Sequence, residues 1–353
     1  MRILWDLRLC SYKYREKGVG KYVFSVIKSA LENGILNNNE IFIWAEKQCV
    51  PSEFYSFFVK WIPYNKTSWK KDLFFIPYLV LKYRINIFHY WISCGPITKI
   101  GMGFFNLCKT CITIHDLGVK YITNDNFLDH VRNTKYWKIQ NLLANFAHCI
   151  ICNSEKTKNE VEKNISLKNK SCYVIYPPII RIANIQKQKK EILLTLSGMN
   201  HKNLQNVIKA FFIFSKDFPL YKLVICGDSE KNILDFTDKI YFEKMDKYEY
   251  YLDNATALIF CSTYEGLGIP PLEAMAHGCP LVLSNIPSLL ETCKDFARFV
   301  NPFDEKSICE GIIDVCKNLD YWIIKSINGF ERYNSMSKNA GKKLIEIYNH
   351  LVK

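Results

Sequence analysis

The sequence predicts an α/β protein built from two doubly wound domains, and three observations support this prediction. Short apolar runs alternate with amphipathic segments of roughly 10–15 residues, which is typical of β-α-β units in a parallel sheet. This alternation occurs twice, and a break at Pro177-Pro178 followed by the polar stretch 186–191 separates the two series. With 353 residues, the chain is long enough for about two domains that each bury a core.

The expected elements follow from the spacing of apolar residues along the chain. In the first half, strands are expected at 3–5, 40–45, 85–89, 110–114 and 148–152, and helices at 19–33, 130–146 and 155–163. In the second half, strands are expected at 192–197, 221–226, 257–260 and 280–283, and helices at 203–216, 247–254 and 271–277. The expected division is an N-terminal domain at 1–180, a C-terminal domain at 190–330, and terminal helices at 331–353 that cross back to the N-terminal domain.

The composition excludes several classes of protein. Hydrophobic residues make up 49% of the chain and charged residues 23%, which excludes a largely disordered or collagen-like protein. Charged residues and Pro77 interrupt the aromatic-rich run Phe74–Trp91, whereas a membrane span needs about 20 mostly apolar residues. Asp6 stands where a signal peptide would carry its apolar stretch. We therefore expect a cytoplasmic protein.

The net charge of +13 is distributed unevenly. Residues 1–180 contain 25 Lys and Arg against 13 Asp and Glu, while residues 181–353 contain 22 against 21. The basic character therefore belongs to the first half of the chain. Anionic lipid, a phosphorylated substrate and nucleic acid are the partners that this charge could attract. A general bias toward lysine-rich composition would not explain the asymmetry.

Fourteen cysteines raise the question of a metal site. The two C-x-x-C pairs are Cys108/Cys111 and Cys149/Cys152, and 37 residues separate Cys111 from Cys149. A zinc ribbon would have about 15–20 residues there. Both pairs also lie in or beside apolar runs, where a free thiol behaves as a small hydrophobic group. We expect core thiols and no metal.

The most informative segment runs from Ser262 to Pro280. An apolar strand ends before it, and the loop Gly266–Gly268 then leads into a helix in which Pro271 fits the first position. Backbone amides before a helix N-terminus favour a phosphate group. Glu265 precedes this turn and Glu273 is expected in the first residues of the helix, so both carboxylates could accept hydrogen bonds from sugar and ribose hydroxyls. The alternative is a helix-dipole carboxylate at Glu273 and an incidental turn residue at Glu265.

The string EGLGIPPLE at 265–273 resembles the signature of retaining glycosyltransferases of family 4. Their GT-B fold consists of two Rossmann-like domains that face a central cleft. Five further segments resemble a subgroup that acts on bacterial polysaccharides of the O-antigen type: GVGKY at 18–22, ITIHDLG at 112–118, ICNSEKTK at 151–158, VIYPPI at 174–179 and LSGMNHKNL at 196–204. The resemblance implies that residues 1–180 bind the acceptor and residues 190–330 bind the nucleotide sugar.

The resemblance also implies roles for individual residues. Glu273 would bind the ribose hydroxyls, and the expected catalytic residues are Glu265 at the donor sugar, Lys202 at the donor diphosphate and His115 reaching the sugar from the N-terminal domain. The full set of expected donor-binding positions is Gly18, Gly20, Gly198, Lys202, Asn203, Glu265, Gly266, Leu267, Gly268 and Glu273. No metal ion or other cofactor is expected, since Lys202 and helix N-termini could supply the counter-charge.

Several of these positions have structural alternatives. Gly18 and Gly20 could form an ordinary turn, His115 could be a core residue, and the pair Lys202-Asn203 could be a solvated lysine with a helix N-cap. The segment also departs from many relatives, which carry an arginine near the lysine. Gly198 is followed by Met199, Asn200 and His201 here, so we expect His201, Arg8 or Lys21 to substitute, or the diphosphate to be held by less charge.

We expect a retaining glycosyltransferase that moves a hexose-type sugar from a nucleotide-diphosphate donor to a hydroxyl of a glycan acceptor. The acceptor is expected to be linked to a polyprenyl diphosphate, with the enzyme peripheral at the anionic inner face of the plasma membrane. The expected membrane-facing residues are Trp61, Trp69, Lys70, Lys71, Phe74 and Phe75, unless this run packs as a helical hairpin in the core. The alternatives are a nucleotide-sugar epimerase and a nucleic-acid-binding protein. The basic half has no nucleic-acid-binding motif, so no nucleic acid partner is expected.

Overall fold

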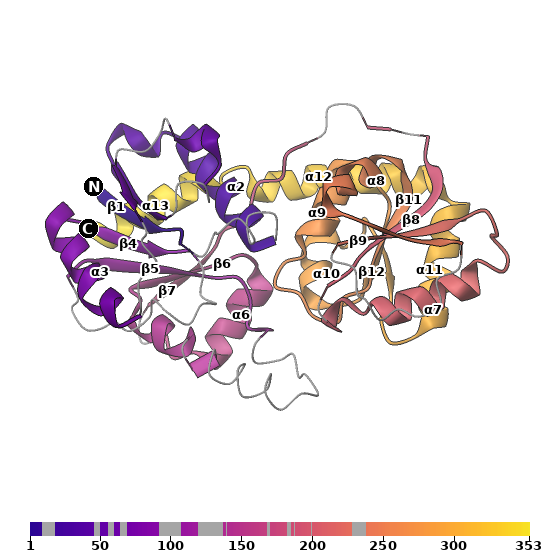
Figure 1. Cartoon of the computed structure of the whole chain (residues 1–353), viewed down its shortest axis with the longest axis horizontal. Coiled ribbons are helices and arrows are strands. Elements are labelled where there is room, and N and C mark those ends of the chain that lie inside the picture. Colours follow the sequence, from indigo (N-terminus) through magenta and orange to yellow (C-terminus); the bar gives the residue numbers. More distant parts are fainter. Residues whose placement is uncertain are drawn as a thin grey trace. The chain divides into compact units, whose positions relative to one another are not determined.

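Two parallel β-sheets, one in each half of the chain, form the framework of the protein (Figure 1). In the computed structural model, one compact unit contains Met1–Pro178 together with Met336–Lys353, and the other contains Ile179–Ser335. The structure describes residues 1–8, 18–45, 50–55, 60–63, 69–91, 107–118, 137–138, 140–167, 170–181, 185–186, 188–198, 200–227 and 238–353.

The first unit contains a seven-stranded sheet with the order β3-β2-β1-β4-β5-β6-β7, in which all paired strands are parallel. Its strands are β1 (Arg2–Asp6), β2 (Glu40–Ala45), β3 (Lys60–Pro63), β4 (Ile87–Tyr90), β5 (Lys109–Ile114), β6 (Cys149–Cys152) and β7 (Ser171–Val174). Most residues of β1, β2, β4, β5 and β6 are buried on both faces, which is the pattern of a parallel sheet covered by helices on both sides.

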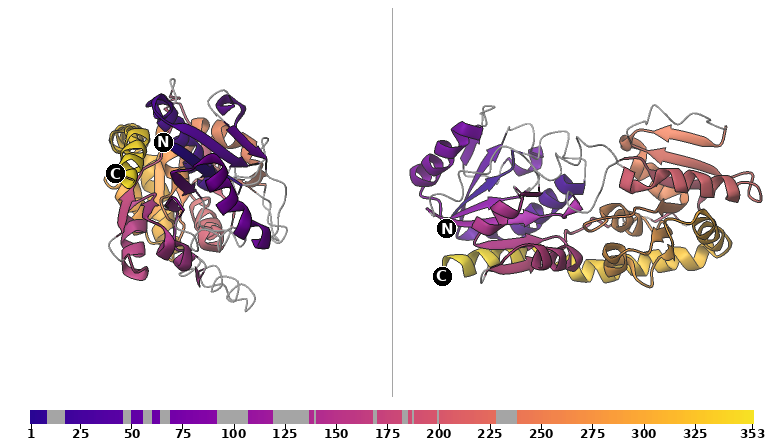
Figure 2. Two further views of the ribbon diagram at one scale, coloured as in Figure 1. Left: turned by 90° about the vertical axis from the view of Figure 1, so that its left-hand side faces the viewer. Right: turned by 90° about the horizontal axis from the view of Figure 1, so that it is seen from below.

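The helices of the first unit pack on the two faces of this sheet. They are α2 (Gly18–Glu32), α3 (Trp69–Tyr83), α6 (Glu155–Asn164) and α13 (Ala340–Val352), with short 3-10 turns at η1 (Ile35–Asn37) and η3 (Ser52–Phe54). One buried cluster joins α3, α6 and the helical residues 140–146 to the sheet. On the other face, α13 contacts α2, and the two chain termini lie close together in this unit (Figure 2).

The second unit contains a six-stranded parallel sheet with the order β10-β9-β8-β11-β12-β13. Its strands are β8 (Lys190–Leu196), β9 (Lys222–Cys226), β10 (Ile240–Glu243), β11 (Ala255–Phe260), β12 (Leu281–Ser284) and β13 (Arg298–Val300). Its helical elements are η4 (Asn200–Lys202), α7 (Leu204–Phe214), η5 (Met245–Lys247), α8 (Tyr248–Asn254), α9 (Ile269–Ala276), α10 (Pro287–Cys293), α11 (Glu305–Lys317) and most of α12 (Leu319–Ser337).

The predicted α/β class with two parallel sheets is confirmed. Four strands were absent from the prediction, namely β3, β7, β10 and β13. Each has only three or four residues and lies at or next to a sheet edge, so it lacks the long apolar run of a central strand. The described residues of the run 61–84 belong mostly to β3 and α3, so the alternative of a helical hairpin was wrong, since residues 61–63 form a strand. Of the helix expected at 130–146, residues 130–136 lie outside the described residues.

Three cysteines of the C-x-x-C pairs are core thiols, as predicted. Cys111, Cys149 and Cys152 are fully buried, and Cys149 lies opposite Cys111 in register, with 3.1 Å between the two Sγ atoms. Burial raises the pKa of Cys111 and Cys152 well above the ordinary thiol value, so both remain protonated near neutral pH.

Among the described residues, no helix is both long enough and apolar enough to cross a membrane.

Candidate functional site

The polar residues singled out in the second unit gather at the carboxyl ends of two neighbouring strands. β8 ends at Leu196 and is followed by Gly198 and η4, while β11 ends at Phe260 and is followed by the loop that leads to α9. β8 and β11 pair in parallel, so the two loops leave the same edge of the sheet side by side. This is the edge at which open parallel sheets bind ligands.

Lys202 and Glu265 meet at this edge. The Nζ of Lys202 lies 2.7 Å from Oε1 of Glu265, and the two side chains are only 21% and 13% exposed. The ammonium group also lies 4.6 Å from the ring centroid of Phe260, which adds a cation–π contact. The structure therefore brings together two residues that are 63 positions apart in the sequence, and it places a partly buried cation beside a carboxylate.

Hydrogen bonds between the loops fix the position of this pair. The backbone N–H of Thr263 donates to the carbonyl oxygen of His201 at 2.8 Å, which joins the two loops directly. A Cβ at Gly198 would lie 3.2 Å from Cγ of Lys202, so this glycine leaves room for the lysine side chain. These contacts hold Lys202 on the side of the loop that faces Glu265.

Asn203 does not act as the helix N-cap that its position suggested. Its backbone is left-handed with φ of 58°, and its side chain makes no capping hydrogen bond to α7. Instead its Nδ2 donates to the carbonyl oxygens of Cys261 at 3.1 Å and Pro302 at 2.6 Å. Asn203 therefore ties three loops of the second unit together, and its amide donors are occupied by the protein.

The glycine loop before α9 is strictly constrained at one position. Gly268 has φ of +90°, and a Cβ there would lie 2.5 Å from Cδ2 of Leu289, so only glycine fits without strain. Gly266 and Leu267 are buried within the loop. Leu267, one of the expected donor-binding positions in this loop, therefore has its side chain packed in the core.

The start of α9 differs from the prediction by two residues. The helix begins at Ile269, so Pro270 and Pro271 occupy the next two positions, where a missing N–H still costs little. Glu273 is therefore the fifth helical residue, two positions further from the start of the helix than expected. It is partly buried, and it contributes to raising the pKa of the buried Tyr248, although burial is the larger cause.

Arg8 was one candidate to replace the arginine that many relatives carry near the lysine, but its charge is already paired with Asp6. Its guanidinium group donates to both carboxylate oxygens of Asp6, at 2.9 and 2.8 Å, and lies 3.2 Å from the ring centroid of Trp44. Both side chains of this ion pair are 2% exposed. The charge of Arg8 is therefore balanced by Asp6 in the core of the first unit.

His115 follows β5 in the first unit and is 3% exposed. Its Nε2 lies 2.9 Å from the carbonyl oxygen of Trp91, so this nitrogen carries the proton and donates it. The ring of Tyr22 and the imidazole form a T-shaped contact, with the ring centroids 4.9 Å apart and the planes at 86°. Burial lowers the pKa of His115. The imidazole is therefore neutral near pH 7 and has its lone pair on Nδ1.

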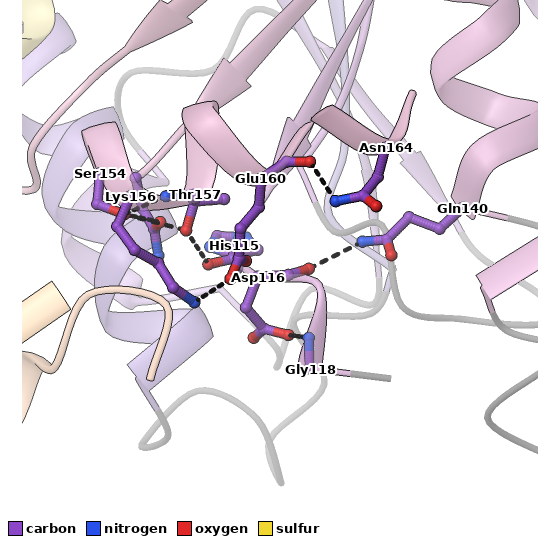
Figure 3. A network of polar contacts seen from close by, with 10 residues as sticks. His115, Asp116, Gly118, Gln140, Ser154, Lys156, Thr157, Glu160 and Asn164 are labelled. Carbon is purple, nitrogen blue, oxygen red and sulfur yellow. Dashed lines mark hydrogen bonds and ion pairs between the residues drawn. The ribbon is translucent and has the colours of Figure 1, made fainter. Parts of the chain in front are cut away.

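The loop that carries His115 is held by the first turn of α6 and by Gln140 (Figure 3). Oγ1 of Thr157 donates to the carbonyl oxygen of His115 at 3.4 Å, and Nε2 of Gln140 donates to that of Asp116 at 3.1 Å. The Asp116 carboxylate accepts the N–H of Gly118 at 2.7 Å and so closes the loop on itself. Asp116 is therefore committed to shaping the loop rather than to orienting the adjacent imidazole.

Residues Ser154 and Thr157 were missed as supports of this site. Ser154 is the N-cap of α6, and its Oγ accepts the backbone N–H of Thr157 at 3.0 Å. A serine followed by a polar helical turn is a recognisable start signal, but the sequence does not show that the capped turn contacts His115.

Gly18 and Gly20 lie in the first turn of α2, where Gly20 is buried, and residues 9–17 before them lie outside the described residues.

Comparisons with known proteins cover nearly the whole chain. A family model described as "Glycosyltransferase Family 4" matches residues 17–180, and one described as "Glycosyl transferases group 1" matches residues 178–343. The O-antigen chain mannosyltransferase RfbU of Salmonella typhimurium is 28% identical over 287 residues, which cover 74% of this chain and 78% of that protein. O-antigen chain mannosyltransferase B of Escherichia coli is 32% identical over 98 residues, covering 28% and 26% of the two chains.

Solved structures show the same fold. Sucrose-phosphate synthase from Thermosynechococcus elongatus superposes with a TM-score of 0.74 at 18% identity, over 99% of each chain. HepE of Anabaena in complex with UDP-glucose superposes with a TM-score of 0.72 at 12% identity, over 99% of this chain and all of that one. The two family models, which together span residues 17–343, identify this chain as a glycosyltransferase of the family 4 type, and the structural neighbours show that it has the GT-B fold.

Proposed function

We propose that this enzyme transfers a hexose from a nucleotide-diphosphate donor to a hydroxyl group of a cell-surface glycan, with retention of the anomeric configuration. The observation that carries the proposal is the Lys202–Glu265 pair at the carboxyl edge of the second sheet, 2.7 Å apart and largely shielded from water. A diphosphate needs a cation of this kind, and a sugar hydroxyl can donate to a carboxylate placed beside it.

In the proposed reaction, the bond between the anomeric carbon and the donor diphosphate breaks while the acceptor oxygen bonds to the same carbon. The acceptor proton passes to an oxygen of the departing diphosphate on the same face of the sugar. Lys202 offsets the negative charge that develops on this leaving group and so stabilises the transition state. Glu265 accepts from the sugar, Glu273 from the ribose, and His115 presents its unprotonated Nδ1 as a hydrogen-bond acceptor to the sugar.

Two donor classes are supported by the relatives. The named relatives from Salmonella typhimurium and Escherichia coli are O-antigen chain mannosyltransferases, and the HepE structures contain UDP and UDP-glucose. GDP-mannose and UDP-glucose are therefore the first donors to test. The two O-antigen relatives support a role in polysaccharide synthesis with a glycan as acceptor. We propose a polyprenyl diphosphate as the carrier of this glycan.

We further propose that the basic first unit meets an anionic membrane surface, which would bring the enzyme to a lipid-linked acceptor. Of the residues expected to face the membrane, Phe75 is partly buried and packs against the core, with 5.7 Å between its ring centroid and that of Trp44. The side chains of Trp61, Trp69, Lys70, Lys71 and Phe74 lie outside the described residues. The same helix exposes Tyr78 and Leu81 beside Lys82, and these side chains suit an interface with anionic lipid.

A two-step experiment tests the proposed function. A thermal-shift screen with UDP-, GDP- and dTDP-sugars identifies the donor, because a ligand that binds only the native state raises the melting temperature. The selected donor is then incubated with a lipid extract, and nucleoside diphosphate and glycosylated product are measured. We expect release of the diphosphate to depend on the acceptor and the product to keep the donor's anomeric configuration. Conversion of the donor sugar without any acceptor would instead indicate an epimerase.

A further inference from the structure

A chain of buried polar and aromatic groups connects the C-terminal helix α13 to the interior of the first unit. Trp5 on β1, His89 on β4, Trp91 after β4 and Tyr348 on α13 are all at most 2% exposed. Nε1 of Trp5 donates to the hydroxyl of Tyr348 at 3.0 Å, and this hydroxyl lies 2.5 Å from Nδ1 of His89. Tyr348 is 343 residues from Trp5 in the sequence, so only the docking of α13 places its hydroxyl there.

The direction of each hydrogen bond in this chain follows from the protons available. Because Trp5 can only donate, the Tyr348 oxygen accepts from it and gives its own proton to Nδ1 of His89. Burial lowers the pKa of His89 well below its usual value, so the ring is neutral and has a single proton, on Nε2. That proton is donated to Oγ1 of Thr113 at 2.8 Å. Tyr348 therefore sets the tautomer of His89.

The orientation of His89 is passed on to His115 through Trp91. The ring of His89 stacks on the indole of Trp91, with the centroids 4.0 Å apart and the planes at 26°. The indole of Trp5 forms a T-shaped contact with the same ring, at a centroid distance of 5.9 Å. The carbonyl oxygen of Trp91 in turn accepts the proton on Nε2 of His115, so the residue that His89 and Trp5 hold in place is the residue that orients His115.

The docking of α13 is itself specific. The backbone N–H of Gly341 donates to Oγ of Ser29 on α2 at 3.0 Å. A Cβ at Gly341 would lie 2.2 Å from the carbonyl carbon and oxygen of Ser29, so only glycine permits this approach. This close approach of α13 to α2 fixes the helix in the position at which the Tyr348 hydroxyl bonds to His89.

We propose that Tyr348 is a positioning residue for His115, acting through His89 and Trp91, and that the C-terminal helix is thereby part of the catalytic apparatus of the first unit. This inference rests on the proposed role of His115 in sugar transfer. It goes beyond that role because it assigns a function to a residue near the end of the chain that contacts neither donor nor acceptor.

The test compares Tyr348→Phe with Ile150→Val. The first change removes one hydroxyl group, and the second removes one methylene from the core on the opposite face of the same sheet, where Ile150 is fully buried. Three quantities are measured for each variant: the ¹⁵N chemical shifts of the His115 imidazole, the affinity for UDP and GDP, and kcat with UDP-glucose and with GDP-mannose in the presence of a lipid extract. Thr113→Val, at the far end of the same chain of hydrogen bonds, provides a second variant that leaves α13 intact.

We expect Tyr348→Phe to shift the His115 imidazole resonances and to lower kcat by about tenfold to a hundredfold, as misplacement of a remote residue can, with unchanged nucleotide affinity. Thr113→Val should also shift the His115 resonances and lower kcat, whereas Ile150→Val should change neither. Unaltered His115 resonances in Tyr348→Phe, or an equal loss of kcat in Ile150→Val, would overturn the inference. The resonances need no substrate, so they decide the positioning separately, whereas absence of turnover by the wild-type enzyme speaks only against the proposed function.

Discussion

Replacing Lys202 by methionine should damage both stability and catalysis, and the two effects can be separated. The variant leaves the carboxylate of Glu265, whose side chain is 13% exposed, without its partner at 2.7 Å. Breaking a fully buried pair costs about 3–5 kcal/mol and an exposed pair about 0–1 kcal/mol. This partly buried pair should therefore cost about 2 kcal/mol, which corresponds to a fall of roughly 4–8 °C in Tm for a unit of this size.

The catalytic effect should be larger than the effect on folding. Loss of one group that offsets transition-state charge typically lowers kcat by about 10²–10³-fold. The double variant Lys202→Met/Glu265→Gln removes the unpaired carboxylate, so it should recover most of the lost Tm without recovering activity. Calorimetry and nucleoside diphosphate release from the donor measure the two effects.

A surface pair in the same unit provides the control. Lys209 lies 3.2 Å from Glu305, but their side chains are 62% and 34% exposed, so Lys209→Met should leave both Tm and kcat nearly unchanged. The reasoning would be refuted if Lys202→Met kept wild-type turnover, or if Lys209→Met reduced turnover as much as Lys202→Met does.

Three further changes test the structural account. Burial holds the pKa of His89 and His115 below the ordinary value, so these histidines take up protons in the unfolded chain before they do in the folded one. The free energy of unfolding should therefore fall as the pH decreases below about 6.5. Urea denaturation between pH 7.5 and 5.5 checks this, and a stability that does not change with pH would contradict it. Gly268→Ala places a Cβ at φ of +90° and 2.5 Å from Leu289, and should lower the free energy of unfolding by about 1–3 kcal/mol, which a melting curve equal to wild type would disprove. Ser154→Ala removes the N-cap of α6 and should cost roughly 1 kcal/mol while lowering kcat more than nucleotide affinity; kinetics that change only the affinity would argue against the support of the His115 loop by α6.

The central strands of both sheets were predictable because each is a short, mostly apolar run between turn signals. β5 and β11 are examples, with almost every residue buried. The edge strands β3 and β10 were not, since a strand with one open edge tolerates polar residues and loses the pattern that identifies it. Glu273 was placed two residues too close to the start of α9, because the prolines at 270 and 271 do not mark the first helical residue, which is Ile269.

The candidate site was predictable only where a local motif carries it. The segment 265–273 and Lys202 follow adjacent strands, so the rule for parallel sheets places them at one edge. The hydrogen bonds of Asn203 to Pro302 and of Tyr348 to His89 span 99 and 259 residues, and no local pattern encodes such distant partners. Arg8 looked like an available cation because its stacking on Trp44 of β2 depends on the packing of β1 against β2, which the sequence does not show. The nearby Asp6 then balances its charge.

Calorimetric titration of the Glu273→Ala variant with UDP and GDP tests the central claim most directly. A ribose hydroxyl that donates to a carboxylate contributes about 1.5–3 kcal/mol, so the variant should bind the preferred nucleotide at least about tenfold more weakly than the wild-type enzyme does. Equal affinity of the two proteins would contradict the claim that Glu273 on α9 holds the ribose of the donor nucleotide.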